Sequence, residues 1–283
     1  MVRISAFLEL AKPRIVVMVM LTAAAGFWLA GPDISQAIVL FHLLMGTVLV
    51  ASGTSALNQV AERKDDALMK RTRGRPLPAN RLGVVPAGAF AWTMGIGGIA
   101  YLGVFVNSLT AVIAATTLIS YVFVYTPLKK RTTVATLIGA VPGALPIVGG
   151  WAAARGTLSG EAWILFWILF LWQLPHFLAL AWMYRDDYAR AGFKMLSVGD
   201  PDGRMTFGHS TLYAAALLPV SLAPTIVGIA GTVYFVGALA LSSVFLYTSF
   251  LAVRKCTMER ARRVFKLSLA YLPALLILMA LGI

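Results

Sequence analysis

Three side chains with oxygen donors follow the second long apolar stretch of the sequence at intervals of four residues. Asn58, Glu62 and Asp66 occupy positions i, i+4 and i+8, so on one continuous helix they share a face and lie about 6 Å apart along its axis. Mg²⁺ is usually held by a few carboxylates together with phosphate oxygens of a substrate. The spacing therefore predicts a Mg²⁺ site completed by phosphate, for which Asp65, about 100° around the helix, is a weaker candidate.

A dense run of basic residues follows these acids. It contains Lys70, Arg71, Arg73 and Arg75, and a guanidinium group can donate paired hydrogen bonds to phosphate oxygens. Acids and arginines together favour a diphosphate bound by metal and by cations. The alternative explanation is a solvated loop whose positive charges set membrane topology and whose acids balance them.

A second group of charged residues follows the sixth apolar stretch. It contains Asp186 and Asp187 as acids, with Arg185 and Arg190 as neighbouring cations. If the second and sixth stretches are neighbours in a helix bundle, the two groups face each other over one cavity mouth. Two metal ions could then bridge one diphosphate.

Two further features are candidates for the same site. Lys129, Lys130 and Arg131 follow the fourth apolar stretch and can hold a leaving diphosphate, and topology signalling is the alternative explanation. His176 lies within the sixth apolar stretch beside Pro175. An ionisable residue at that depth is a functional candidate, and its alternative role is a neutral imidazole hydrogen-bonded to another helix.

The elements that must position these residues are membrane helices. Of the 283 residues, 59% are hydrophobic and 12% are charged, and apolar runs long enough to cross a bilayer recur along the whole chain. We therefore expect one all-α domain over residues 1–283, a polytopic membrane bundle of about nine transmembrane helices. The expected spans are approximately 14–30, 37–57, 85–106, 108–125, 133–153, 162–183, 211–229, 231–253 and 264–281.

The basic residues are distributed unequally between the two sides of this arrangement. All of the 24 Lys and Arg residues except Arg155 fall on one side, which the positive-inside rule identifies as the cytoplasmic side. We therefore expect a protein of the cell membrane with a cytoplasmic N-terminus and an external C-terminus. Residues 58–84 and 184–210 become cytoplasmic active-site segments, and the lipid bilayer, not nucleic acid, accounts for the net charge of +13.

Four segments of the sequence together resemble the UbiA superfamily of intramembrane prenyltransferases, and within it the heme O synthases. An Asn-x-x-x-Glu-x-x-x-Asp spacing followed by Met69, Arg71 and Arg75 is similar to the heme branch, whereas Lys194 and Ser197 replace two prolines of the family pattern. The four segments are LAKPRIVVMVMLTAAAGFWLAG, NQVAERKDDALMKRTRGRP, YTPLKKRT and WQLPHFLALAWMYRDDYARAGFKMLSV.

The resemblance implies transfer of a farnesyl group from farnesyl diphosphate to a vinyl group of heme B, with addition of water, giving heme O. It implies Mg²⁺ as cofactor and association with heme A synthase or with terminal oxidase assembly. Prenylation of an aromatic quinone or chlorophyll precursor and membrane transport are the alternative functions. The implied metal ligands are Asn58, Glu62, Asp66, Asp186 and Asp187; the implied diphosphate ligands are Arg71, Arg75, Lys129, Lys130, Arg131, Arg185 and Arg190; the implied catalytic residues are Asn58, Glu62, Asp66, Asp187 and His176.

Overall fold

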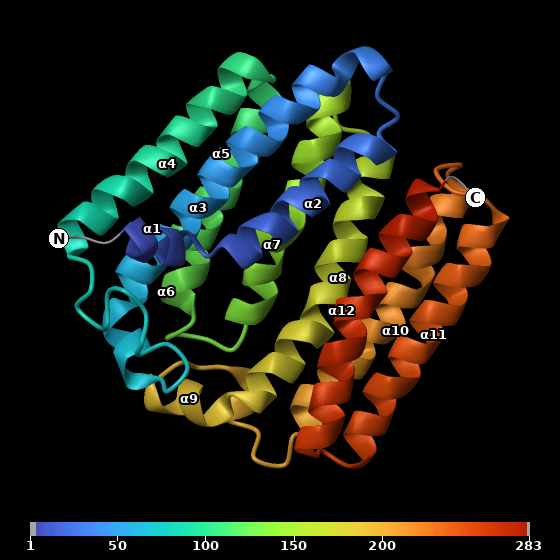
Figure 1. Ribbon diagram of the computed structural model, residues 1–283. Helices are drawn as coiled ribbons and strands as arrows, with labels where there is room; N and C mark the ends of the chain where they lie inside the picture. Colours follow the sequence, from blue (N-terminus) through green and yellow to red (C-terminus); the bar gives the residue numbers. More distant parts are fainter. Residues whose placement is uncertain (1–3, 282–283) are drawn as a thin grey trace.

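The computed structural model describes residues 4–281, and all regular elements in this range are helices (Figure 1). The all-α prediction is therefore confirmed for the described part of the chain. The elements are α1 (Ile4–Ala11), α2 (Pro13–Leu29), η1 (Ile34–Gln36), α3 (Ala37–Leu68), α4 (Val84–Phe105), α5 (Ser108–Ile119), η2 (Ser120–Tyr125), α6 (Thr126–Leu128), α7 (Ala135–Arg155), α8 (Gly160–Met183), α9 (Arg185–Arg190), η3 (Leu196–Val198), α10 (Arg204–Ile226), α11 (Thr232–Arg254) and α12 (Met258–Ala280).

Each of the nine expected spans coincides with a helix, but fewer than nine have the length and apolar character of a membrane span. Among the described residues seven helices meet both conditions, with α5, η2 and α6 counted as one continuous run. Helix α2 has only 17 residues, and α10 is not among the seven because polar residues and two prolines interrupt its apolar sequence. Seven such helices make the chain an integral membrane protein.

Helix α3 is longer than a bilayer requires. Its 32 residues extend about 48 Å at 1.5 Å per residue, whereas the hydrocarbon core is about 30 Å thick. The helix therefore continues past the apolar part of its sequence for several turns, and these turns carry Asn58, Glu62 and Asp66. The continuous helix on which the metal-site prediction depended is present.

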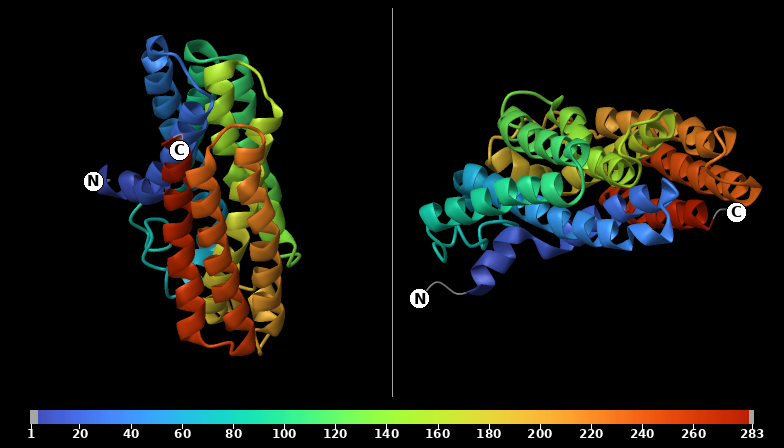
Figure 2. Two further views of the ribbon diagram at one scale, coloured as in Figure 1. Left: turned by 90° about the vertical axis from the view of Figure 1, so that its right-hand side faces the viewer. Right: turned by 90° about the horizontal axis from the view of Figure 1, so that it is seen from above.

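The helices pack around two hydrophobic cores that lie side by side (Figures 1 and 2). One core lies among α1, α2, α3, α4 and α5 around Leu43 and Leu102. The other lies among α7, α8, α10, α11 and α12 around Phe245 and Tyr271. Helix α2 crosses to α7. Their backbones approach so closely that a Cβ atom on Gly150 would meet the Ala23 carbonyl oxygen, which is the use of small residues typical of membrane helix contacts.

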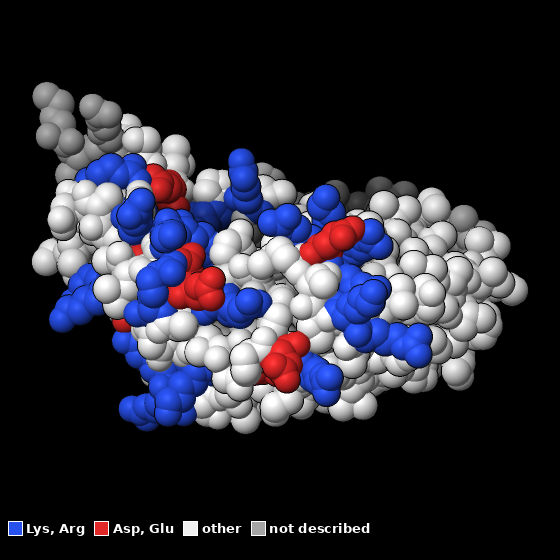
Figure 3. All heavy atoms as spheres, turned by 90° about the horizontal axis from the view of Figure 1, so that it is seen from below, with Lys and Arg blue, Asp and Glu red and all other residues white. Residues whose placement is uncertain are grey.

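The charged residues gather at one end of the bundle. Figure 3 views the lower end of Figure 1, where Lys and Arg side chains and fewer acids cover the face formed by the segments after α3, α6, α8 and α11. The C-terminus lies at the other end (Figure 1). Arg155, the basic residue expected on that opposite side, donates from Nε to the Ala30 carbonyl oxygen after α2.

Candidate active site

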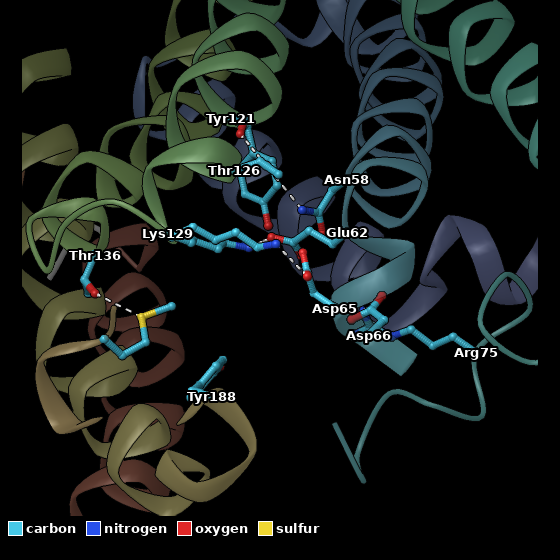
Figure 4. A network of polar contacts seen from close by, with 12 residues as sticks. Asn58, Glu62, Asp65, Asp66, Arg75, Tyr121, Thr126, Lys129, Thr136 and Tyr188 are labelled. Atoms are coloured by element: carbon cyan, nitrogen blue, oxygen red, sulfur yellow. Dashed lines mark hydrogen bonds and ion pairs between the residues drawn. The ribbon is translucent and has the colours of Figure 1, made fainter. Parts of the chain in front are cut away.

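The predicted acids of α3 are buried at the charged end of the bundle. Asn58, Glu62 and Asp66 are 2%, 6% and 0% exposed, and their side chains point toward residues of other segments (Figure 4). A buried polar or charged group is costly unless it is paired. The partners of these three residues therefore define the site.

Each acid near the end of α3 is paired with a base from another segment (Figure 4). Glu62 Oε1 lies 2.7 Å from Lys129 Nζ, and Asp66 Oδ2 lies 2.7 Å from Arg75 Nη1. Asp65 is also paired, since its Oδ1 lies 2.6 Å from Lys130 Nζ. No sequence pattern beyond the charges themselves predicts these pairs, and the weaker candidate Asp65 belongs to the same array.

A π-helical turn delivers Lys129 to Glu62. Residues Ser120–Tyr125 form this turn, and an extra residue in one helical turn changes the direction of the side chains that follow. Thr126 then accepts a hydrogen bond from Asn58 Nδ2 at 3.2 Å. Burial alone would lower the pKa of Lys129, but the adjacent Tyr125 and Glu62 oxygens raise it above its ordinary value, so Lys129 carries its charge here.

Lys12 is a member of the site that sequence reasoning did not select. It adopts a left-handed backbone conformation with φ 55° immediately before Pro13 begins α2, and this turn directs Nζ to within 3.4 Å of Asn58 Oδ1. Burial and the charges of Arg75 and Lys129 lower the pKa of Lys12 to about 7. The sequence feature that could have identified Lys12 is its place in the LAKPR segment, but there it was interpreted only as one of the basic residues that set membrane topology.

Asp187 joins the two predicted active-site segments. Its carboxylate accepts hydrogen bonds from the backbone N–H groups of Lys70, at 3.1 Å, and Arg71, at 3.3 Å, and it pairs with Arg190. The Arg71 guanidinium lies over the rings of Tyr184 and Tyr188, 4.7 and 5.4 Å from their centroids. The segments after α3 and α8 therefore meet, although α7 packs between those two helices.

Three of the predicted metal and diphosphate ligands lie outside this array. The Asp186 side chain is 87% exposed, and Arg185 lies over the Trp182 ring, 4.2 Å from its centroid. Arg131 is exposed and has no ion pair within residues 4–281. The structure does not bring these three side chains to the acids of α3.

His176 lies on α8 and contacts α12. Its Nδ1 is 2.8 Å from Ser268 Oγ, and its ring stacks on Phe265 and on Trp172 with centroid separations of 4.7 and 5.5 Å. The hydrogen bond to another helix, which was the alternative to a functional role, is therefore present. This hydrogen bond accounts for Nδ1 but not for the second ring nitrogen, Nε2.

The oxygen donors of α3 fit a Mg²⁺ ion that also binds phosphate. Within the described range no group of three or more His, Cys, Asp or Glu side chains is placed to hold a metal ion by itself, but Mg²⁺ commonly takes one or two carboxylates plus substrate phosphates. Glu62 and Asp66 supply the carboxylates and Asn58 an amide oxygen. Their present partners Lys129 and Arg75 are groups that bind phosphate well.

Comparison with known proteins identifies the family. The model of the UbiA prenyltransferase family matches residues 19–272. The chain therefore belongs to the UbiA prenyltransferase family. Solved structures agree in fold: a digeranylgeranylglyceryl phosphate synthase superposes with a TM-score of 0.81 at 17% identity over 98% of this chain and 97% of that one.

Curated relatives place the chain more narrowly within the family. It is 47% identical to a protoheme IX farnesyltransferase of Solibacter usitatus over 97% of both chains. It is 45% identical to the protein of that name from Salinibacter ruber over 96% of both chains. A UbiA homologue of Archaeoglobus fulgidus, solved with DMAPP and Mg²⁺, has a TM-score of 0.65 at 14% identity, covering 96% of this chain and 99% of that one.

Proposed function

We propose that this chain is an intramembrane, Mg²⁺-dependent prenyltransferase that moves a farnesyl group from farnesyl diphosphate to a vinyl group of protoheme IX, which is heme B. The products are heme O and diphosphate. The observation that carries the proposal is the buried array of paired acids and bases at the end of α3, in a chain 47% identical to a relative named for this reaction.

The acids form the metal side of the proposed site. Asn58, Glu62 and Asp66 would hold Mg²⁺, and Asp187 would join them when diphosphate is bound. A bound Mg²⁺ neutralises charge on the diphosphate. Support comes from the burial of the three α3 side chains and from their oxygen donors, which suit this hard cation.

The bases form the diphosphate side. Lys129 and Arg75 turn from Glu62 and Asp66 toward phosphate oxygens, so each acid is released as each base gains a new partner. Arg71, Lys130 and Arg190 extend the same positive surface. Preorganised cations aimed at developing negative charge are among the strongest contributors to catalysis, and here they stabilise the leaving diphosphate while the allylic C–O bond breaks.

The carbon chemistry needs a dry environment. The electron pair of the broken C–O bond leaves with the diphosphate, and the vinyl π electrons of heme B form the new C–C bond to the farnesyl carbon. Water then adds to the carbon beside the porphyrin and loses one proton. Lys129 lies over the ring of Tyr125, and Tyr121 packs edge-on against that ring. These aromatic rings suit stabilisation of the allylic cation, and the membrane-embedded core excludes bulk water.

The proposal extends to location and partners. The site would face the cytoplasm in the cell membrane, with the N-terminus inside and the C-terminus outside, because the basic residues gather at the end of the bundle that bears the site (Figure 3). Heme O is a hydrophobic product. Its transfer to heme A synthase or to terminal oxidase assembly is the partner association that we propose.

An acceptor panel tests the proposed reaction. Purified protein receives farnesyl diphosphate and Mg²⁺ with either heme B or an aromatic quinone precursor, and products are identified by mass. We expect a product from heme B that has gained one farnesyl group and one hydroxyl group. Product from the quinone precursor alone would assign the chain to aromatic prenylation, and flux across a vesicle membrane without product would assign it to transport.

A further inference from the structure

Ser268 fixes the tautomer of His176. The Ser268 hydroxyl lies 2.6 Å from the Phe265 carbonyl oxygen, and two oxygens at that separation require the hydroxyl proton between them. Ser268 Oγ, 2.8 Å from His176 Nδ1, can therefore only accept from the imidazole. A neutral imidazole with the proton on Nδ1 presents an unprotonated lone pair at Nε2.

The ring is held in one orientation, and Nε2 is unused. Trp172, one helical turn before His176, donates from Nε1 to the Ser268 carbonyl oxygen at 2.8 Å, and Phe265 stacks on the imidazole from α12. Nε2 makes no hydrogen bond to any described residue. It is also not completely buried, since the fully buried polar atoms without a partner do not include it. This arrangement, with Nδ1–H bound by a neighbour and Nε2 open, is that of a metal-ligating histidine.

His176 faces the interior between the two halves of the bundle. On α8, Gln173 donates to the Ala140 carbonyl oxygen of α7 at 2.8 Å, and Trp172 faces α12. At 100° per residue His176 lies between these two directions, and α2 packs against both α7 and α12. His176 is also about 12 Å along the helix from Tyr184, whose ring receives Arg71 of the proposed diphosphate site.

The other two histidines occupy unsuitable places. His42 is near the start of α3, at the opposite end of that helix from the acids, and its Nδ1 lies 2.6 Å from the Tyr101 hydroxyl. His209 is exposed and lines a crevice of about 130 Å³ with Leu174 and Leu178. Those leucines lie on the side of α8 turned away from His176.

We infer that His176 Nε2 is an axial ligand of the iron in the porphyrin acceptor. This inference rests on the proposed function, because it requires an iron porphyrin to be the acceptor. The Nε2 lone pair forms the coordinate bond in place of a water ligand, so no proton moves. Ligation fixes the porphyrin plane near α8, and a fixed acceptor lowers the entropic cost of bringing the vinyl carbon to the allylic cation. His176 thereby binds and positions the acceptor.

Heme spectroscopy of the purified membrane protein tests this assignment. Protein in lipid nanodiscs is titrated with ferric heme B, and axial ligation is read from Soret absorbance and electron paramagnetic resonance. We expect a histidine-ligated spectrum for the unmodified chain, its loss in His176→Ala, and its recovery when free imidazole is added. His42→Ala and His209→Ala are the matched controls and should keep the spectrum of the unmodified chain.

Two further variants distinguish loss of the iron ligand from loss of the folded protein. His176→Met retains a side chain that fills the site and should give a thioether-ligated spectrum. Ser268→Ala leaves the ligand but removes its orienting partner, and it should weaken heme affinity about 10-fold to 100-fold. Size-exclusion profiles show whether each variant remains folded.

The outcomes separate the ligand from the reaction. Heme O formation with an unchanged ligation spectrum in His176→Ala, or loss of ligation in His42→Ala or His209→Ala instead, would overturn the ligand assignment and leave the proposed reaction standing. If the unmodified chain neither binds heme B nor forms heme O, the proposed function itself is wrong and the assignment ends with it.

Discussion

Replacement of Asp66 by Asn removes one negative charge from the centre of the site with almost no change in shape. The Asp66 carboxylate is fully buried, and both of its oxygens accept from Arg75 Nη1, at 2.9 and 2.7 Å. Breaking a sealed pair costs about 3–5 kcal/mol, but the Arg75 side chain is 27% exposed and can turn toward water. We therefore expect Asp66→Asn to lower the free energy of unfolding by about 2 kcal/mol, near the value of hydrogen bonds to charged groups.

The expected loss of activity is larger than this loss of stability. Asp66 has two proposed roles, since it holds Mg²⁺ and keeps Arg75 in place for diphosphate. Removal of one preorganised electrostatic contact typically lowers kcat about 10²-fold to 10³-fold, equivalent to about 2.7–4 kcal/mol. Heme O formed per minute by purified Asp66→Asn protein measures this change, and thermal unfolding in the same detergent measures stability.

Asp65→Asn is the matched control. Asp65 is the adjacent acid of the same helix and is also paired, but its partner Lys130 has a side chain that is 50% exposed, and exposed ion pairs contribute about 0–1 kcal/mol. We expect Asp65→Asn to retain activity within about tenfold of the unmodified chain. Near-normal turnover in Asp66→Asn, with a larger loss in Asp65→Asn, would refute the assignment of Asp66 to the metal site.

Three further perturbations test other parts of the structure. Lys12 has a pKa lowered to about 7, so it is charged below that pH and neutral above it. If Lys12 helps to bind diphosphate, the apparent affinity for farnesyl diphosphate should weaken more from pH 6 to pH 8 in the unmodified chain than in Lys12→Arg. An equal change of affinity with pH in both proteins would contradict this role of Lys12. Removal of Mg²⁺ with a chelator should abolish heme O formation and readdition should restore it, whereas full activity in chelator would reject the metal requirement. Gly150→Ala forces a Cβ against the Ala23 carbonyl oxygen and should lower the free energy of unfolding by about 1–3 kcal/mol or more, as measured by thermal unfolding. Gly97→Ala is its control, because a Cβ at that position meets no atom within 4 Å. An equal loss of stability in both variants would refute the close α2–α7 contact.

The helical part of the site was predictable because it depends on local periodicity. Asn58, Glu62 and Asp66 share a face on any continuous helix, and the apolar runs locate all nine helices that correspond to the expected spans. Within residues 4–281 seven of these helices have the length and apolar content of a full span, and the short α2 and the polar, proline-containing α10 do not meet that condition.

The tertiary part of the site was not predictable from spacing. Lys12 reaches Asn58 through a left-handed backbone turn, and Lys129 reaches Glu62 through a π-helical turn. Neither feature has a periodic sequence signal. Asp187 was expected as a metal ligand because of its charge. Its observed partners are Arg190 and backbone N–H groups of the loop after α3, and the loop contact depends on the packing of distant segments.

Lys194, which replaces a proline of the family pattern, makes a backbone contact in the structure. Its backbone N–H donates to the Lys129 carbonyl oxygen at 2.7 Å, and a proline at this position has no N–H to donate. The segment after α9 is therefore tied directly to the residue that pairs with Glu62. Ser197, at the second proline position, is buried and its hydroxyl has no partner among the described residues.

In the proposed reaction the α3 acids and their paired bases carry out farnesyl transfer to heme B. The most direct test is the product mass from heme B, farnesyl diphosphate and Mg²⁺, measured side by side for the unmodified chain and Asp66→Asn at equal folded concentration. We expect heme O from the unmodified chain and at most about one hundredth of that rate from the variant. Equal heme O formation by both proteins, or none by the unmodified chain, would contradict it.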